Sequence, residues 1–192
     1  MGRGRVAVVI GAVALVWVLD PSPGAATPAQ EPAPEHIAAL SEYVAGIDRY
    51  AALRARFEEP LPPFDDCRNA WSLQLQRLYL AAAIRSARHR ATVGDIFTPR
   101  VAAFFRREIA EAIYEIDIEG LLDEDTEGPL VDLAINEPIP VWAMRPVPQA
   151  LLERLAPLPV AIEYQLVGDA LILWDVHAGI LIDALPSAFT EP

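Results

Sequence analysis

One pair of residues near the end of the chain has types and a spacing that could do chemistry. Asp175 and His177 stand two residues apart at the end of an apolar run. Side chains two apart on a strand point to the same face, so the carboxylate and the imidazole could share one ligand or one proton. A third metal ligand would have to be brought near by folding, from His36, His89 or residues 123–127.

A simpler interpretation of the same pair is structural. Short aspartate side chains often accept hydrogen bonds from the amides of a turn. Asp175 would then cap the turn that leads into Ala178 and Gly179, with His177 at the edge of that turn. We favour this interpretation, because the spacing of ligands in structural zinc sites does not occur in the chain.

A second group of possible ligands lies in an acidic segment. Asp123, Asp125 and Glu127 alternate before Gly128, as at the start of a helix–loop–helix calcium loop. Such a loop needs a bidentate glutamate at its twelfth position, and that position is Ala134. We therefore interpret the segment as a solvated acidic turn. The candidate metal ligands of the chain are Asp175, His177, Asp123 and Asp125.

A catalytic centre cannot be assembled from the sequence. The serines lack the Gly-x-Ser-x-Gly context of a nucleophile, and no glycine-rich phosphate loop occurs. Cys67 has no catalytic signature around it, and as the single cysteine it cannot form an internal disulfide. The sequence thus predicts a protein that is not an enzyme, with no catalytic residues and no cofactor.

The strongest structural signal comes from residues 159–188. Three strand-like runs are separated by Gly168-Asp169 and by His177-Ala178-Gly179, which predicts a three-stranded antiparallel β-meander. A tight turn at Gly168-Asp169 would place three pairs opposite each other: Leu166 and Leu171, Tyr164 and Leu173, and Ile162 and Asp175.

The second face of this meander is nearly as apolar as the first. Both faces therefore need covering, by helices from earlier in the chain or by a partner. The residues that we expect to make contacts with a partner are Ile172, Trp174 and Val176.

Residues 35–128 have helical patterns, and three amphipathic helices are expected. The first ends at Pro60, and the second runs from about Cys67 to Arg90. Thr98 and Pro99 suit the N-cap and first position of the third. One apolar stripe of the second helix consists of Trp71, Leu75, Leu78 and Ala82.

Prolines recur over residues 129–158, which indicates an extended arm with a short helix near 149–155. Residues 35–188 are thus expected to form one α+β domain. It would contain about three helices, the Pro-rich arm and the C-terminal meander, with helices covering one side of the sheet.

The N-terminus resembles an export signal. Arg3 and Arg5 precede an uncharged run of about 14 residues, Val6 to Leu19, and small residues up to Ala26 follow a break. This predicts a signal peptide over residues 1–26, because the run is shorter than the roughly 20 residues that span a bilayer. An uncleaved membrane anchor is the alternative. Residues 27–34 would be a disordered Pro-rich leader.

Charge limits the classes of partner. The chain has a net charge of −12, and without residues 1–26 the balance becomes −13, from 13 arginines and 26 acidic residues. Nucleic acids and anionic membrane surfaces are bound by basic faces, so neither is expected as a partner. Membrane attachment is expected only through an uncleaved signal sequence.

Several segments carry a resemblance to known proteins. They are residues 94–99 (GDIFTP), residues 122–125 (LDED), and the tail from Leu158 to Asp183. Together they resemble a family of exported bacterial proteins without an established activity. The match of Tyr164, Val167-Gly168-Asp169 and Asp175 to Gly179 is also similar to the C-terminal hairpin of periplasmic nickel/cobalt-homeostasis proteins.

These observations lead to two hypotheses about function. The first is a non-catalytic protein of the bacterial periplasm or exterior, which acts by protein–protein contact with another envelope protein or with itself. The alternative is a small-ligand or divalent-metal binding module that uses Asp175, His177 and the acidic residues near Asp123.

Overall fold

The computed structural model describes residues 33–64, 69–113 and 131–189, all of which lie in one compact unit, residues 32–192. The predicted signal peptide, residues 27–32 of the predicted leader, the acidic segment with Asp123 and Asp125, and Cys67 lie outside the described residues. The last two residues of the predicted leader are described: Ala33 is the N-cap of the first helix and Pro34 its first residue, so the prediction of a disordered leader is wrong for these two residues. In the described parts of the chain, no helix has the length and apolarity needed to cross a membrane.

Three long helices come first, as expected. Helix α1 covers Pro34–Glu58, with a proline in its first turn, and ends just before Pro60. Helix α3 covers Pro99–Ile113, and the amide of Val101 lies 3.5 Å from the Thr98 hydroxyl that was predicted to cap it.

Helix α2 covers Ala70–Ala87 and is shorter at both ends than predicted. Its N-cap is Asn69, whose side chain accepts a hydrogen bond from the amide of Ser72 at 2.8 Å. An asparagine in this place satisfies an amide that the helix itself leaves unpaired.

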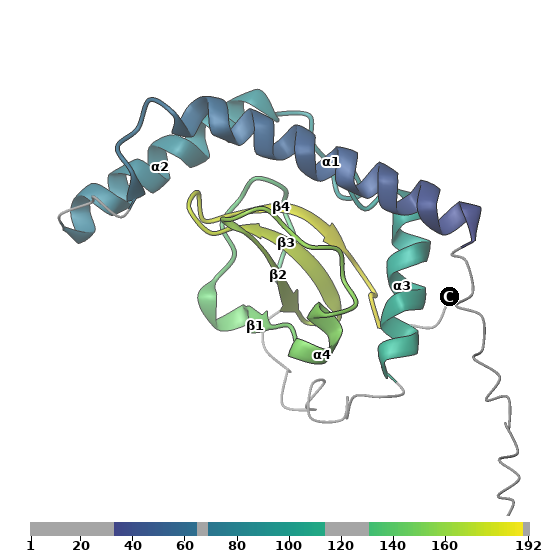
Figure 1. The fold of residues 1–192 in the computed structure, drawn as a ribbon. Coiled ribbons are helices and arrows are strands. Elements are labelled where there is room, and N and C mark those ends of the chain that lie inside the picture. The colour runs from purple at the N-terminus through teal and green to yellow at the C-terminus, as the bar shows by residue number, and fades with distance from the viewer. Residues whose placement is uncertain (1–32, 65–68, 114–130, 190–192) are drawn as a thin grey trace, which may run out of the picture. The chain divides into compact units, whose positions relative to one another are not determined.

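The C-terminal sheet has four antiparallel strands in the order β1-β2-β3-β4, so the prediction of three strands is wrong by one (Figure 1). The additional strand, β1, covers Arg145–Pro146 in the Pro-rich arm and pairs with Leu166 and Gln165. It is only two residues long, because proline has no amide hydrogen to continue a ladder of hydrogen bonds. The arm also contains a 3₁₀ turn, Val141–Ala143, and a short helix α4, Gln149–Leu152, near the expected position.

Strands β2 (Ile162–Val167), β3 (Ala170–Asp175) and β4 (Ile180–Leu185) form the predicted meander. All three predicted pairs of residues are confirmed: Leu166 opposite Leu171, Tyr164 opposite Leu173, and Ile162 opposite Asp175. The first turn contains Gly168 at a φ of +57°, which glycine adopts without a steric penalty.

Helices cover one face of the sheet, and α1 runs across it (Figure 1). Tyr43 and Ile47 from α1 and Phe105 and Ile109 from α3 pack in one cluster with side chains of β2, β3 and β4. The amphipathic face predicted for α3 is therefore the face that enters the core.

The arm covers the opposite face of the sheet. Ile139, Leu133 and Met144 pack in a second cluster with side chains such as Ile172 and Trp174. Backbone hydrogen bonds hold the arm at the edge of β4: the Asn136 amide donates to the Leu181 carbonyl at 2.8 Å, and the Leu181 amide donates to the Glu137 carbonyl at 2.9 Å.

A register shift in the sheet redirects one carboxylate. Leu173 pairs with Asp183 and Trp174 with Leu181, which leaves Ile182 without an opposite residue. Such a bulge changes the direction in which the following side chains point. Asp183 is fully buried and accepts hydrogen bonds at 2.6–2.8 Å from four backbone amides, those of Gly94, Ile96, Phe97 and Ala184.

Candidate functional site

The residues predicted to do chemistry, Asp175 and His177, meet the C-terminal part of α1. Tyr50, Arg54 and Glu58 follow one another at four-residue intervals, so their side chains lie on one face of the helix. This face is turned toward the end of β3 and the turn that follows it. Arg54 is 8% exposed and Asp175 is fully buried.

Asp175 has a partner on each side. Its Oδ2 accepts a hydrogen bond from the Tyr50 hydroxyl at 2.8 Å and lies 3.0 Å from Arg54 Nε. Its Oδ1 accepts a hydrogen bond from the Ala178 amide at 2.8 Å. The last of these is the turn-capping contact that the structural interpretation predicts.

Arg54 links Asp175 to Glu58 and His177. Its two terminal nitrogens lie 2.7 and 2.8 Å from the two oxygens of Glu58, a fork that matches the geometry of a carboxylate. His177 Nδ1 lies 2.6 Å from Arg54 Nη2 and 2.7 Å from Glu58 Oε1. This nitrogen can accept from the guanidinium in one protonation state and donate to the carboxylate in the other.

Asp175 and His177 therefore do share a partner, and the partner is a guanidinium. A positive charge at hydrogen-bond distance from both side chains opposes the binding of a metal cation between them. Within the described residues, no group of three or more His, Cys, Asp or Glu side chains is arranged to hold a metal ion. His36 and His89 lie elsewhere: His36 contacts Phe104, and His89 contacts the Ser86 carbonyl.

An open groove borders this cluster. Phe64 stacks on the His177 ring with 4.2 Å between ring centroids, and Pro62, Pro63 and Val160 line the space beside them. The groove has a volume of about 720 Å³ and places Glu58 and Glu59 next to one imidazole. The inner side chains of the cluster are occupied with each other, which indicates that they fix the turn between β3 and β4 to α1.

The residues predicted to contact a partner are mostly covered by the chain itself. Ile172 is fully buried, Trp174 is 8% exposed, and Val176 is half-buried. The arm provides the cover, since residues 131–144 pack on them. A contact through these three residues would first require the arm to leave the sheet.

Among the described residues, helix α2 carries four large apolar side chains that are each more than half exposed. Leu80 and Ile84 face the core, and the stripe recognised in the sequence faces solvent. Trp71 is 75% exposed, Leu75 and Leu78 are each 57% exposed, and Tyr79 is 59% exposed. Helix α2 contains no acidic residue. Its arginines are turned elsewhere: Arg85 pairs with Glu137, and Arg77 lies against Gly179.

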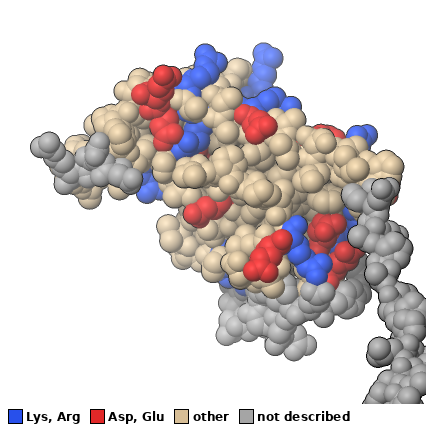
Figure 2. Space-filling view, viewed as in Figure 1, with Lys and Arg blue, Asp and Glu red and all other residues tan. Residues whose placement is uncertain are grey.

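Charged side chains are distributed differently on the rest of the surface. On the face shown in Figure 2, arginine and acidic side chains lie in small mixed groups, and the described residues form no continuous basic area there. The uncharged outer side of α2 thus differs from a surface of mixed charge.

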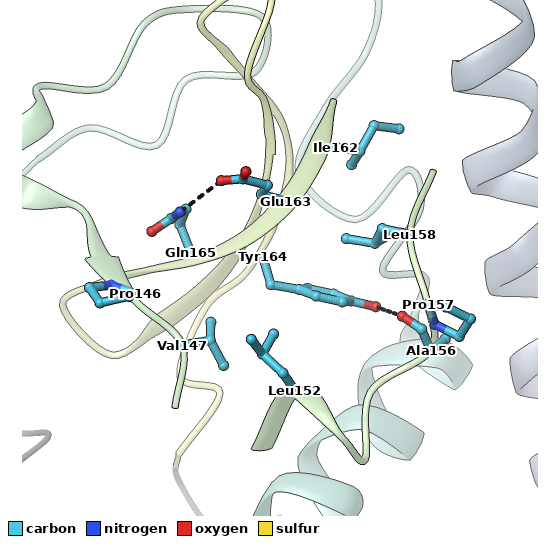
Figure 3. A pocket seen from close by; sticks show the side chains of 10 residues that line it. All are labelled: Pro146, Val147, Leu152, Ala156, Pro157, Leu158, Ile162, Glu163, Tyr164 and Gln165. Atoms are coloured by element: carbon cyan, nitrogen blue, oxygen red, sulfur yellow. Dashed lines mark hydrogen bonds between the residues drawn. The ribbon is translucent and has the colours of Figure 1, made fainter. Parts of the chain in front are cut away.

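A smaller pocket lies beside strand β2, at the place where β1 ends. It has a volume of about 380 Å³ and is lined mainly by apolar side chains, among them Val147, Leu152, Leu158 and Ile162 (Figure 3). Tyr164 reaches across its floor and donates a hydrogen bond from its hydroxyl to the Ala156 carbonyl at 2.9 Å (Figure 3). Glu163 and Gln165 supply polar groups at the opposite side, as Figure 3 shows.

Sequence reasoning missed Tyr50, Arg54 and Glu58 as partners of Asp175. Their four-residue spacing was a signal that they share one face of a helix. No local pattern in the sequence indicates that this face meets a turn more than 115 residues later; the contacts join residues that are 119 to 125 positions apart. The exposure of the α2 stripe also could not be read from its pattern, because the same helix has a second apolar side.

Comparison of the chain with protein-family models, with curated proteins and with solved structures finds no match. The likeness to exported bacterial proteins and to nickel/cobalt-homeostasis proteins therefore stays a prediction.

Proposed function

We propose that this is an exported, non-catalytic protein of the bacterial envelope that acts by contact with another protein chain, and that the outer side of α2 makes this contact. The contact surface is made of Trp71, Leu75, Leu78 and Tyr79, and we call it the α2 face. Export is supported by the basic start and short apolar run of residues 1–26.

One observation carries the proposal: the α2 face exposes large apolar side chains over more than two helical turns without a charge among them. Contiguous exposed apolar areas larger than a few hundred Å² are rare on monomeric soluble proteins, and the largest such area on a protein is often an interaction site. Tryptophan and tyrosine are also enriched where binding energy concentrates in protein interfaces. The apolar face that the sequence suggested for this role, on the sheet, is already covered by the arm.

Site-specific photo-crosslinking in the native host would test this. A photoreactive amino acid replaces Leu75 in the full chain, and a second variant carries it at Glu153, an exposed residue at the C-cap of α4 that is far from α2 in the sequence. We expect a discrete adduct with a protein chain at position 75 and none at position 153. Equal, weak labelling at both positions would refute a contact at the α2 face.

A second candidate function rests on the apolar pocket beside β2. Its volume of about 380 Å³ and its few polar groups fit a small apolar ligand, which is the chemistry of many small-molecule sites. Native mass spectrometry of the chain isolated gently from its host would detect such a ligand. Leu152→Trp would fill the pocket and should abolish the bound mass; retention of the ligand in this variant would exclude the pocket as its site.

A further inference from the structure

Three residues of the α2 face, together with Ala82, have the spacing of a helix-pairing seam. Trp71, Leu75, Leu78 and Ala82 follow at intervals of four, three and four residues, which is the alternation of a heptad repeat. All four positions are exposed. A seam with this period suits packing along a second helix, because it keeps the apolar side chains on one line over several turns.

The seam is also complementary to itself when reversed. In an antiparallel pair of α2 helices centred between residues 76 and 77, Trp71 of one copy lies opposite Ala82 of the other, and Leu75 lies opposite Leu78. The largest side chain of the seam thus faces the smallest, and the two leucines face each other. A two-fold interface requires this kind of self-complementarity, since the same surface patch serves both subunits.

We infer that the partner bound by the α2 face is a second copy of this chain, held as an antiparallel α2–α2 pair about a two-fold axis. This inference rests on the proposed function and names the partner for it.

Charge and area agree with such a pair. Two copies that each carry a net charge of −12 repel one another, and the repulsion is weakest where neither presents a carboxylate. Helix α2 has no acidic residue, so its outer side meets this condition. From their exposed fractions, the four side chains of the α2 face expose on the order of 500 Å² per copy, so a pair that covered them completely would bury about 1,000 Å², which is the lower bound for a specific interface.

An interface of this size predicts a dimer that forms and dissociates with concentration. Sedimentation velocity of the full chain, isolated from its host, over about 1 to 100 µM should show the change from monomer to dimer, since affinities in this range correspond to interfaces at the lower size limit. Leu78→Arg should leave the chain monomeric at every concentration. Val93→Arg is the matched control, because Val93 is an exposed apolar residue outside α2, and this variant should dimerise like the wild type.

A swap of side-chain size tests the antiparallel register. Ala82→Trp alone would set two tryptophans against each other and should weaken dimerisation at least tenfold. The double variant Trp71→Ala/Ala82→Trp restores one large and one small residue at each end, and its dimerisation should return to within about threefold of the wild type. Both positions are exposed, so thermal melts of these variants should match the wild type, which separates loss of pairing from loss of folding.

Three results would overturn the inference: a monomer at all concentrations, a dimer that Leu78→Arg does not affect, or a double variant that stays as weak as Ala82→Trp. The crosslinking experiment separates this inference from the proposed function. An adduct at position 75 with the mass of two copies supports both. An adduct with a different protein leaves the proposed function standing and refutes the second copy as the partner.

Discussion

Replacement of Asp183 by asparagine should destabilise the fold more than any other isosteric change of a carboxylate in the described residues. Asp183 Oδ1 accepts from the amides of Gly94 and Ala184, both at 2.8 Å, and Oδ2 accepts from Ile96 at 2.6 Å and Phe97 at 2.7 Å. An asparagine keeps one oxygen and replaces the other by an amide group that can only donate.

The magnitude follows from the two amides that lose their acceptor. A buried donor without a partner costs about 1–3 kcal/mol, so two cost about 2–6 kcal/mol. Part of this is recovered, because the variant no longer buries a charge. Burial raises the pKa of Asp183, and the four amides oppose that rise, which shows that the charged form is costly in this place. We therefore expect a net loss of about 3 kcal/mol, which lowers the melting temperature by about 6–12 °C for a chain of this length.

Thermal and denaturant unfolding would measure the change, and hydrogen exchange would locate it. The two amides that lose their acceptor, either those of Gly94 and Ala184 or those of Ile96 and Phe97, should exchange faster in the variant, by more than the global loss of stability explains. Asp169→Asn is the control, since Asp169 is exposed in the β2–β3 turn and its side chain can be exchanged at little cost. A melting temperature within about 2 °C of the wild type for Asp183→Asn would refute the reasoning.

Two further predictions concern other buried polar groups. Arg54→Met should lower the unfolding free energy by about 3–5 kcal/mol, since it leaves Asp175 buried without its cation. The double variant with Asp175→Asn should recover part of this loss. Equal stability of Arg54→Met and the wild type in denaturant titrations would contradict the prediction. Burial raises the pKa values of three tyrosines above their ordinary value of about 10, so these groups stay protonated in the folded chain and ionise in the unfolded chain. The unfolding free energy should therefore fall as the pH rises above about 10, by about 1.4 kcal/mol per pH unit for each of these tyrosines. The ultraviolet signal of ionised tyrosine should rise together with unfolding. Ionisation of all five tyrosines in a chain that stays folded would refute this prediction. The three tyrosines are Tyr43, Tyr50 and Tyr164.

Much of the secondary structure follows from local chemistry. The β2–β3 register was predictable because Gly168-Asp169 fixes a tight turn, and a turn of known length determines which residues pair. The face of α3 was predictable because its polar and apolar sides are clearly separated. Helix α2 begins later than predicted, since the side chain of Asn69 accepts the hydrogen bond that caps it.

The candidate site was predictable only in part. The proximity of Asp175 to His177 and the capping of the Ala178 amide follow from short sequence distances. The identity of their shared partner does not, because Arg54 reaches them across more than 120 residues of sequence. On local evidence Asp175 and His177 could have held a metal ion, but in the structure both contact the guanidinium of Arg54.

By itself, the sequence determined an α+β chain with a C-terminal meander, because hydrophobic period, turn glycines and caps act within a few residues. The tertiary structure decided which apolar surfaces stay exposed. The arm covers Ile172 and Trp174 and contributes a fourth strand, while Trp71, Leu75 and Leu78 are left outside. This could not be read from residue types, since both surfaces are equally apolar and their burial depends on which distant segment folds against each of them.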